Sequence, residues 1–264
     1  IIFTLLKESI PIFMHSSPSQ LLFGRFWYPT ADPPEFGMWP LILGSAVVTL
    51  GAMLVCVPIG VGTALYIHEL ASRRQRAFLK PIIEILAGVP SIVYGFFGMV
   101  IVAPFLQGIL DIPTGLCAFT ASLILGVMAT PTVASLSEDA LSFVPRSFRE
   151  ASLALGANRW QTLTRVVVPA AGSGLSTAII LGMGRAVGET MAVIMVCGNT
   201  LEIPDSPLDP LRTLTSNIAL EMGYATGEHR EALFATAVTL FVIIMILNIA
   251  ALTIARRGMV SNDR

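Results

Sequence analysis

Five runs of sequence without a charged side chain constrain the fold of this chain most. Each run is close to or longer than the roughly 18 to 20 apolar residues with which a helix crosses the hydrocarbon core of a bilayer. The runs are Phe36–Ile67, Ile85–Leu110, Ile112–Ser137, Val166–Gly184 and Ala232–Ala255. Because backbone groups in lipid must satisfy their own hydrogen bonds, helices are the expected structure. We therefore expect an all-α bundle that crosses the membrane several times.

The composition agrees with a membrane protein. Of the 264 residues, 54% are hydrophobic and 12% are charged, which is roughly half the charged share of a soluble domain. The net charge of −1 gives no basic surface for nucleic acid. Cys56, Cys117 and Cys197 lie in or at the ends of apolar runs, so we expect small buried hydrophobic side chains. The three histidines are far apart in sequence, which does not indicate a metal site.

In chain order, we expect six transmembrane helices. Residues 1–13 are too short to span alone and are interpreted as the outer end of a truncated first span. A loop rich in proline and aromatic residues follows, in which Phe26, Trp27 and Tyr28 are expected to anchor at the membrane interface. The complete spans are expected at Trp39–His68, at Phe78–Leu110, from the turn Asp111–Gly115 to about Ser137, at Ala170–Cys197 and at Ala232–Ala255. Near the start of the second of these, Lys80 and Glu84 are expected to form a local ion pair.

The lysine and arginine counts predict the orientation of the chain. The loops expected inside hold eleven of these residues, namely Arg73, Arg74, Arg76, Lys80, Arg146, Arg149, Arg159, Arg165, Arg256, Arg257 and Arg264. The loops expected outside hold three, namely Arg25, Arg212 and Arg230. Cytoplasmic loops of membrane proteins carry an excess of lysine and arginine. We therefore expect both termini in the cytoplasm.

One polar segment, Ser137–Ala170, lies between two apolar runs and has a helical pattern. Apolar side chains recur at steps of three and four, which indicates one face of an amphipathic helix. These side chains are Leu141, Val144, Phe148, Ala151 and Leu155. Gly156 is expected to end this helix in the left-handed conformation, and Asn158 is expected to cap a second one. The second helix has Trp160, Leu163 and Val167 on one side and ends near Pro169.

The pattern alone also fits an interfacial helix that only connects two spans. However, Glu150-Ala151-Ser152, Gly156 and the later Val166-x-Val168-Pro169 resemble the EAA loop of permease subunits of ABC importers. The resemblance implies that residues 138–169 form a cytoplasmic coupling loop, which docks on a separate ATPase subunit. The residues that it implies for this coupling are Glu150, Ala151, Ser152, Gly156, Ala157, Asn158 and Trp160.

Two charged residues, Arg185 and Glu189, lie inside an expected span. An arginine at depth costs about 2.5–3.5 kcal/mol on insertion scales, so it should face protein or water. Gly184 directly precedes Arg185 and Gly188 directly precedes Glu189, and these glycines are expected to let another helix approach closely. In one interpretation, Arg185 and Glu189 form a structural i,i+4 ion pair. In the other, the Arg185 guanidinium contacts an oxyanion during passage, and Glu189 holds it and moderates its attraction for the anion.

The run RAVGETMAVIMVCGNT is similar to the phosphate-specific permeases of ABC importers, closer to their C-type than to their A-type subunit. The stretches LLFGRFWYP and EILAGVPSIVYGFFG agree, so the resemblance covers essentially the whole chain. It implies a type I importer permease fold in which residues 1–264 are a single transmembrane domain forming half of a phosphate path. The implied partners are an A-type permease, two ATPase subunits and an extracytoplasmic phosphate-binding protein. Sulfate and molybdate permeases share the EAA loop and remain alternatives.

The sequence has no G-x-x-x-x-G-K-[ST] motif that could bind the phosphates of ATP. The resemblance implies that this chain binds no cofactor and that ATP and magnesium bind to the partner ATPase. The expected location is the bacterial inner membrane, in contact with lipid. A rival from another class is an ATP-independent channel or secondary carrier, in which the intramembrane charges form a gate or ion relay. A membrane-embedded enzyme is disfavoured because no catalytic constellation can be argued.

Overall fold

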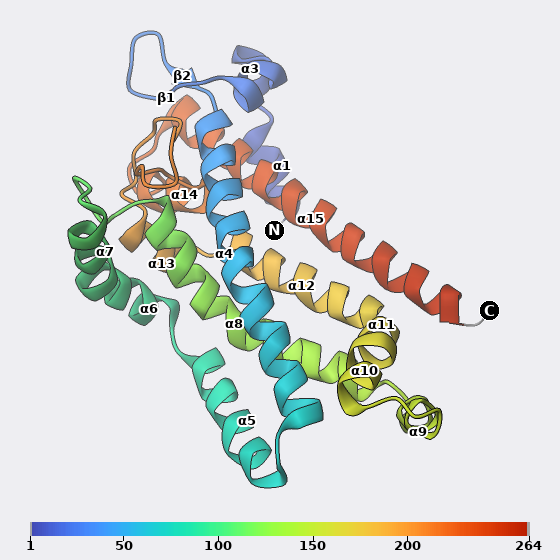
Figure 1. The fold of residues 1–264 in the computed structure, drawn as a ribbon. Helices are drawn as coiled ribbons and strands as arrows, with labels where there is room; N and C mark the ends of the chain where they lie inside the picture. The colour runs from blue at the N-terminus through green and yellow to red at the C-terminus, as the bar shows by residue number, and fades with distance from the viewer. Residues whose placement is uncertain (1, 263–264) are drawn as a thin grey trace. The chain divides into compact units, whose positions relative to one another are not determined.

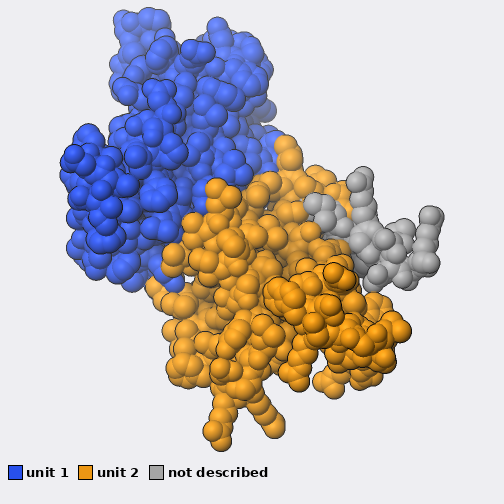
Figure 2. All heavy atoms as spheres, in the orientation of Figure 1, with its two compact units in different colours: residues 1–52, 90–125, 186–245 blue, residues 53–89, 126–185, 246–264 orange. Residues whose placement is uncertain are grey.

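The computed structural model describes residues 2–262 and is built mainly of helices (Figure 1). In this part of the chain, the only strands are β1 (Trp27–Tyr28) and β2 (Glu35–Phe36), which pair antiparallel. Contacts divide the chain into two compact units, which Figure 2 colours separately. Unit 1 comprises residues 1–52, 90–125 and 186–245, and unit 2 comprises residues 53–89, 126–185 and 246–264. The all-α prediction is confirmed.

Several helices are long and apolar enough to cross a membrane. Separately, four described helices contain residues of both units, namely α4 (Trp39–Leu65), α8 (Ala118–Ser142), α12 (Gly172–Val187) and α15 (Gly227–Asn262). Among the described residues, the candidate spans are Trp39–Leu70, Ser91–Leu110, Ala118–Ser142 and Gly227–Ala250. A fifth results if Arg159–Ala170 and Gly172–Val187, bent by 68°, count as one span. The first helix, α1 (Ile2–Ser9), is shorter than a span, as the sequence indicates.

The second expected span starts later than predicted. In place of one helix from Phe78, the structure has α5 (Arg73–Gly88), α6 (Ser91–Phe97), the π-helix η2 (Gly98–Val102) and α7 (Ala103–Leu110). Pro90 lacks a backbone N–H and disfavours the helical conformation at Val89, so α5 ends there. Lys80 on α5 does not form the expected pair with Glu84, because its Nζ lies 3.3 Å from Oε2 of Glu138 on α8.

The core of unit 1 gathers short helices and the β-hairpin around the start of α15. The short helices are α2 (Ile12–His15), α3 (Pro18–Phe23) and α14 (Leu214–Glu221). A further short helix of unit 1, α13 (Met191–Val196), packs against α6 instead. Trp27 packs in this core with Leu21, Leu214 and Leu233, and it is fully buried. The prediction that Trp27 anchors at the membrane interface is therefore wrong. Its neighbours Phe26 and Tyr28 are exposed and stack on each other with ring centroids 6.0 Å apart.

Unit 2 contains the predicted coupling loop. Its shorter elements are the π-helices η1 (Tyr66–Leu70) and η3 (Leu163–Val167), with α5, α9 (Arg146–Ala154), α10 (Arg159–Thr162) and α11 (Val168–Ala170). Leu141, Val144, Leu163 and Val167 are buried in one cluster, so both halves of the loop are held by a common core. This packing gives the loop a defined shape.

Helices α8 and α12 pack closely within unit 2 at two glycines of α12. A Cβ at Gly174 would lie 2.7 Å from Cβ of Ala140, and one at Gly182 would lie 2.5 Å from Cγ2 of Val133. The expected close approach at Gly184 is not found within this unit, because a Cβ there would meet no atom within 4 Å. Gly182 and Gly184 are two residues apart and differ in direction by about 200° on the helix. The two glycines therefore occupy different faces of α12.

Candidate functional site

The loop between α8 and α12 is a helical hairpin whose first helix is shorter than predicted. The expected amphipathic helix is split, because α8 continues to Ser142 and α9 begins only at Arg146. Pro145 occupies the N-cap of α9, and proline restricts the residue before it to an extended conformation. The split separates the predicted apolar face. Leu141 and Val144 are buried, whereas Phe148 and Leu155 are exposed.

The turn of the hairpin has the predicted geometry. Gly156 has φ +86°, a left-handed conformation that side chains other than glycine rarely adopt. Asn158 caps α10, since its side-chain oxygen accepts a hydrogen bond from the backbone N of Gln161 at 2.8 Å. The Gln161 side chain accepts a hydrogen bond from the backbone N of Asn158 at 3.0 Å, which completes a capping box. The predictions for Gly156 and Asn158 are confirmed.

We use the term loop surface for a set of exposed residues on α9, the turn and α10 of this hairpin. These are Phe148, Glu150, Ala151, Leu153, Leu155, Gly156, Asn158 and Trp160. Leu155 is 90% exposed and Trp160 is 65% exposed. A hollow of about 590 Å³ lies along the same hairpin, and Phe148, Ala151, Leu155 and Ala157 are among the residues that line it. Exposed apolar residues gathered in this way mark interaction sites, and tryptophan is enriched among residues that dominate binding energy.

Ser152 and Ala157 are the two predicted coupling residues that are not exposed. Ala157 is half-buried, and Ser152 is buried with its hydroxyl oxygen 3.0 Å from that of Thr162. This hydrogen bond joins α9 to α10. Ser152 therefore supports the hairpin from within, whereas the other members of the set present their side chains or backbone at its surface.

Arg185 lies in the last turn of α12 and is exposed. Within unit 2, no described residue forms a hydrogen bond or ion pair with its guanidinium. The predicted continuous helix through Glu189 is wrong, because α12 ends at Val187 and the next helix, α13, begins at Met191. Since Glu189 lies outside α12, Arg185 and Glu189 are not one turn apart on the same helix. The structural interpretation, an i,i+4 ion pair between them, therefore loses its geometric basis. The guanidinium N–H groups of Arg185 therefore have no partner among the described residues of unit 2, and they can donate hydrogen bonds to a ligand.

Glu189 has a local structural role in unit 1. Its Oε1 accepts a hydrogen bond from the backbone N of Ala192 at 3.3 Å, near the start of α13. Its backbone carbonyl accepts a hydrogen bond from the hydroxyl of Thr215 at 2.8 Å. The break between α12 and α13 frees backbone groups, and these bonds satisfy some of them. Glu189 therefore stabilises the broken part of the chain.

Unit 1 also contains a buried polar network that the sequence analysis missed. The carboxylate of Glu221 accepts hydrogen bonds from Trp27 Nε1 at 2.8 Å and from Arg212 Nη1 at 2.6 Å. His229 Nε2 lies 2.8 Å from the same carboxylate, and Arg212 also donates to the side chain of Asn217 at 3.0 Å. The network joins β1, α14 and α15. Its sequence signal is a concentration of polar residues between the last two expected spans, after Cys197 and before Ala232.

The same network affects one tyrosine nearby. Partial burial and, secondarily, the negative charge of Glu221 raise the pKa of the Tyr224 hydroxyl. The Tyr224 ring lies 5.8 Å from the His229 ring, measured between centroids. Because the ordinary pKa of tyrosine is about 10, a raised value keeps this hydroxyl protonated at neutral pH. Tyr224 therefore adds no charge to the network.

We expect Arg212→Met to destabilise the protein strongly. The side chains of Arg212 and Glu221 are only 15% and 6% exposed, and removing one partner of a buried pair costs about 3–5 kcal/mol because the other charge stays buried. The thermal unfolding midpoint in detergent should fall. As a control, Glu228→Gln disrupts the exposed His15–Glu228 pair at 4.0 Å and should leave the midpoint unchanged. Equal midpoints for both variants would contradict a structural role of the network.

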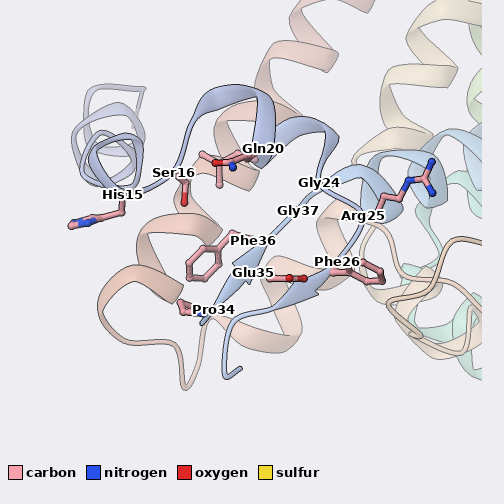
Figure 3. A pocket seen from close by; sticks show the side chains of 11 residues that line it. His15, Ser16, Gln20, Gly24, Arg25, Phe26, Pro34, Glu35, Phe36 and Gly37 are labelled. Atoms are coloured by element: carbon pink, nitrogen blue, oxygen red, sulfur yellow. The ribbon is translucent and has the colours of Figure 1, made fainter. Parts of the chain in front are cut away.

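A hollow of about 370 Å³ lies between α3 and the β-hairpin of unit 1 (Figure 3). His15, Gln20, Arg25 and Glu35 are among the residues that line it. The picture shows Gln20 and Glu35 on different segments, with the Arg25 side chain directed away from them. Side chains of both charge signs line the hollow, so its lining does not indicate an anion site.

The helices and the loop surface define a class of protein. It is a polytopic membrane protein in which a hairpin between two membrane helices exposes apolar side chains for an interaction. The family model described as "Binding-protein-dependent transport system inner membrane component" matches residues 56–258. The chain is 44% identical over 210 residues to the "Probable ABC transporter permease protein YqgH" of Bacillus subtilis, covering 80% of this chain and 68% of that protein. It is 33% identical over 255 residues to the "Phosphate transport system permease protein PstC" of Haemophilus influenzae, covering 89% and 80%.

Two solved structures of ABC transporters have a similar fold, in agreement with the family model. A chain of the MetNI methionine ABC transporter in an inward-facing conformation has a TM-score of 0.62 at 24% identity, covering 92% of this chain and 99% of that one. A chain of a bacterial ABC transporter involved in alginate import also has a TM-score of 0.62, at 15% identity, covering 97% and 95%. The chain belongs to the family of binding-protein-dependent transport system inner membrane components, the ABC importer permeases. The predicted permease fold and the family resemblance are confirmed.

Proposed function

We propose that this chain is the permease subunit of an ATP-driven phosphate importer and forms half of the translocation pathway. The single observation that carries the coupling part of the proposal is the loop surface. Exposed apolar side chains, including a tryptophan, are displayed on a hairpin that packs on a buried cluster between membrane helices. Such a surface fits a protein partner better than it fits solvent. A separate ATPase that docks there can move the helices on either side of the hairpin.

Phosphate as the transported anion is supported by the relatives and by Arg185. Permeases named for phosphate transport in Haemophilus influenzae and Mesorhizobium japonicum are 33% and 34% identical to this chain. The guanidinium of Arg185 is exposed, and within unit 2 it has no partner among the described residues. A guanidinium matches the oxygens of a tetrahedral oxyanion with two parallel hydrogen bonds. We assign Arg185 to contact with the passing anion and Glu189 to holding the adjacent broken segment.

The proposal also names the partners of the chain and its orientation. A second, A-type permease completes the pathway, two ATPase subunits bind ATP and magnesium, and an extracytoplasmic protein delivers phosphate. This chain binds no cofactor and catalyses no reaction. The excess of lysine and arginine supports a cytoplasmic hairpin with both termini inside. ATP-driven closure of the ATPases then alternates the pathway between inward-open and outward-open states.

The stimulation of ATP turnover by different oxyanions tests this proposal. The complex of this chain with its partner permease, ATPase and binding protein is reconstituted in liposomes, and ATP hydrolysis is measured with phosphate, sulfate or molybdate. We expect phosphate alone to stimulate turnover and to accumulate inside the vesicles. Stimulation by sulfate or molybdate would identify a different anion. Phosphate flux without any ATPase would support the rival channel or carrier.

A further inference from the structure

Arg149, on the first helix of the hairpin, contacts two other elements of unit 2. Its Nε and Nη2 donate to Oε1 of Glu69 at 3.0 and 2.6 Å, and Glu69 lies in the π-helix η1 at the end of α4. Its Nη1 donates to the backbone carbonyl of Val144 at 2.8 Å, and its Nη2 to that of Leu141 at 3.3 Å. One side chain on α9 is therefore bonded to the ends of both α4 and α8.

These contacts are partly shielded from water. The side chains of Arg149 and Glu69 are 19% and 18% exposed, so the pair is screened less than an ion pair at an open surface. The final carbonyls of a helix lack partners within the helix, and a cation near them is favoured by the helix dipole. Arg149 bonds the Leu141 carbonyl in the last turn of α8 and the Val144 carbonyl just beyond it. Several hydrogen bonds together therefore fix the position of the Arg149 side chain.

The segment that carries Glu69 is held from a second side. Arg76 on α5 donates from Nε to the Ile67 carbonyl at 3.0 Å and from Nη2 to the His68 carbonyl. Both carbonyls belong to η1, which is a single π-helical turn. π-helical turns are rare and occur frequently at functional sites. Two arginines from different helices therefore hold this irregular end of α4.

The hairpin has a separate internal link that does not involve Arg149. The hydroxyls of Ser152 and Thr162 join α9 to α10, and Leu163 and Val167 of η3 are buried in the same cluster as Leu141. These contacts shape the loop surface. The Arg149–Glu69 pair instead connects that surface to α4. The two links can therefore be separated by substitution.

We propose that Arg149 is a positioning residue that makes α9 and the η1 end of α4 move together when the docked ATPase moves. This inference rests on the proposed function, because it requires an ATPase on the loop surface. Arg149 acts through η1, where it donates to Glu69 and where its Nη2 also lies 3.3 Å from Nε2 of His68. It needs no contact with the anion. If the pair is broken, the docking surface remains but its movement reaches α4 less effectively. ATP hydrolysis is then uncoupled from phosphate uptake.

The experiment compares phosphate uptake per ATP hydrolysed in the reconstituted complex. For Glu69→Gln and Arg149→Gln, we expect the ATPase to co-purify as with the wild type and ATP turnover to remain, while uptake per ATP falls on the order of tenfold. Glu69→Gln leaves the donors that Arg149 directs to the carbonyls of α8 intact, so it tests the ion pair alone.

Lys80→Gln is the matched control. It removes another ion pair of unit 2, between Lys80 on α5 and Glu138 on α8 at 3.3 Å, which does not involve the hairpin helices α9 and α10. Uptake per ATP should equal that of the wild type in this variant. Unchanged uptake per ATP in Glu69→Gln would overturn the inference, and so would loss of assembly in both Glu69→Gln and Arg149→Gln. Failure of the wild-type chain to bind any ATPase would instead overturn the proposed function.

Discussion

Replacing Arg185 with glutamine is expected to abolish phosphate uptake while the complex still assembles. Two charge-assisted hydrogen bonds from one guanidinium are worth about 3 kcal/mol or more, which corresponds to about a hundredfold in affinity. Glutamine keeps a polar side chain but loses both the charge and the fork. Because Arg185 has no partner within unit 2 among the described residues, we expect no loss of stability. Uptake of labelled phosphate into proteoliposomes measures the effect.

Two further substitutions sharpen this test. Arg185→Lys keeps the charge without the planar fork and should retain a small part of the uptake. Arg74→Gln removes an exposed arginine of α5 and should leave uptake unchanged. Loss of assembly in Arg185→Gln would show that the arginine holds the fold instead of contacting the anion.

Changing the hairpin turn or its acidic residue is expected to abolish both ATPase assembly and uptake. Gly156 has φ +86°, and its backbone N donates to the Leu153 carbonyl at 3.0 Å. Proline fixes φ near −65° and has no N–H, so Gly156→Pro disrupts the turn in two ways. Glu150→Lys reverses a charge on the loop surface without changing the turn. Co-purification of the ATPase and phosphate uptake measure both effects.

Controls distinguish a lost turn from a general defect. A Cβ at Gly156 would meet no atom within 4 Å, so Gly156→Ala adds only the cost of a left-handed alanine, about 1–2 kcal/mol. We expect this variant to assemble more weakly than the wild type but better than the proline variant. Glu202→Lys reverses an exposed charge outside the hairpin and should assemble normally. Normal assembly of Gly156→Pro and Glu150→Lys would mean that the ATPase does not dock on this surface.

The local parts of the structure could be predicted because their causes lie within a few residues. Charge-free runs predict helices in lipid, and the glycine and asparagine of the hairpin predict a left-handed turn followed by a cap. Gly156 and Asn158 have this geometry in the structure. Cys56, Cys117 and Cys197 are buried without a disulfide, as their apolar surroundings indicate. In these cases the neighbouring sequence is sufficient to predict the local structure.

The remaining features depend on partners that are distant in sequence. A tryptophan in an aromatic-rich loop fits a membrane anchor, and only the packing against α14 and α15 shows that Trp27 is bonded to Glu221. Lys80 has a glutamate one turn away, yet it pairs with Glu138 on another helix. The break after Val187 was missed because the apolar residues before Arg185 and after Thr190 fit one continuous span. The local periodicity of a sequence does not predict which distant residues will contact each other.

Photocrosslinking at Leu155 tests most directly whether the hairpin meets a cytoplasmic ATPase. Leu155→p-benzoylphenylalanine places a photoreactive group at the most exposed part of the loop surface, and Tyr224→p-benzoylphenylalanine places one in unit 1 as a control. In transporting vesicles, we expect the group at position 155 to link to the ATPase and the group at position 224 not to link to it. An ATPase link at position 224, or none at position 155 in vesicles that still import phosphate, would contradict the proposal.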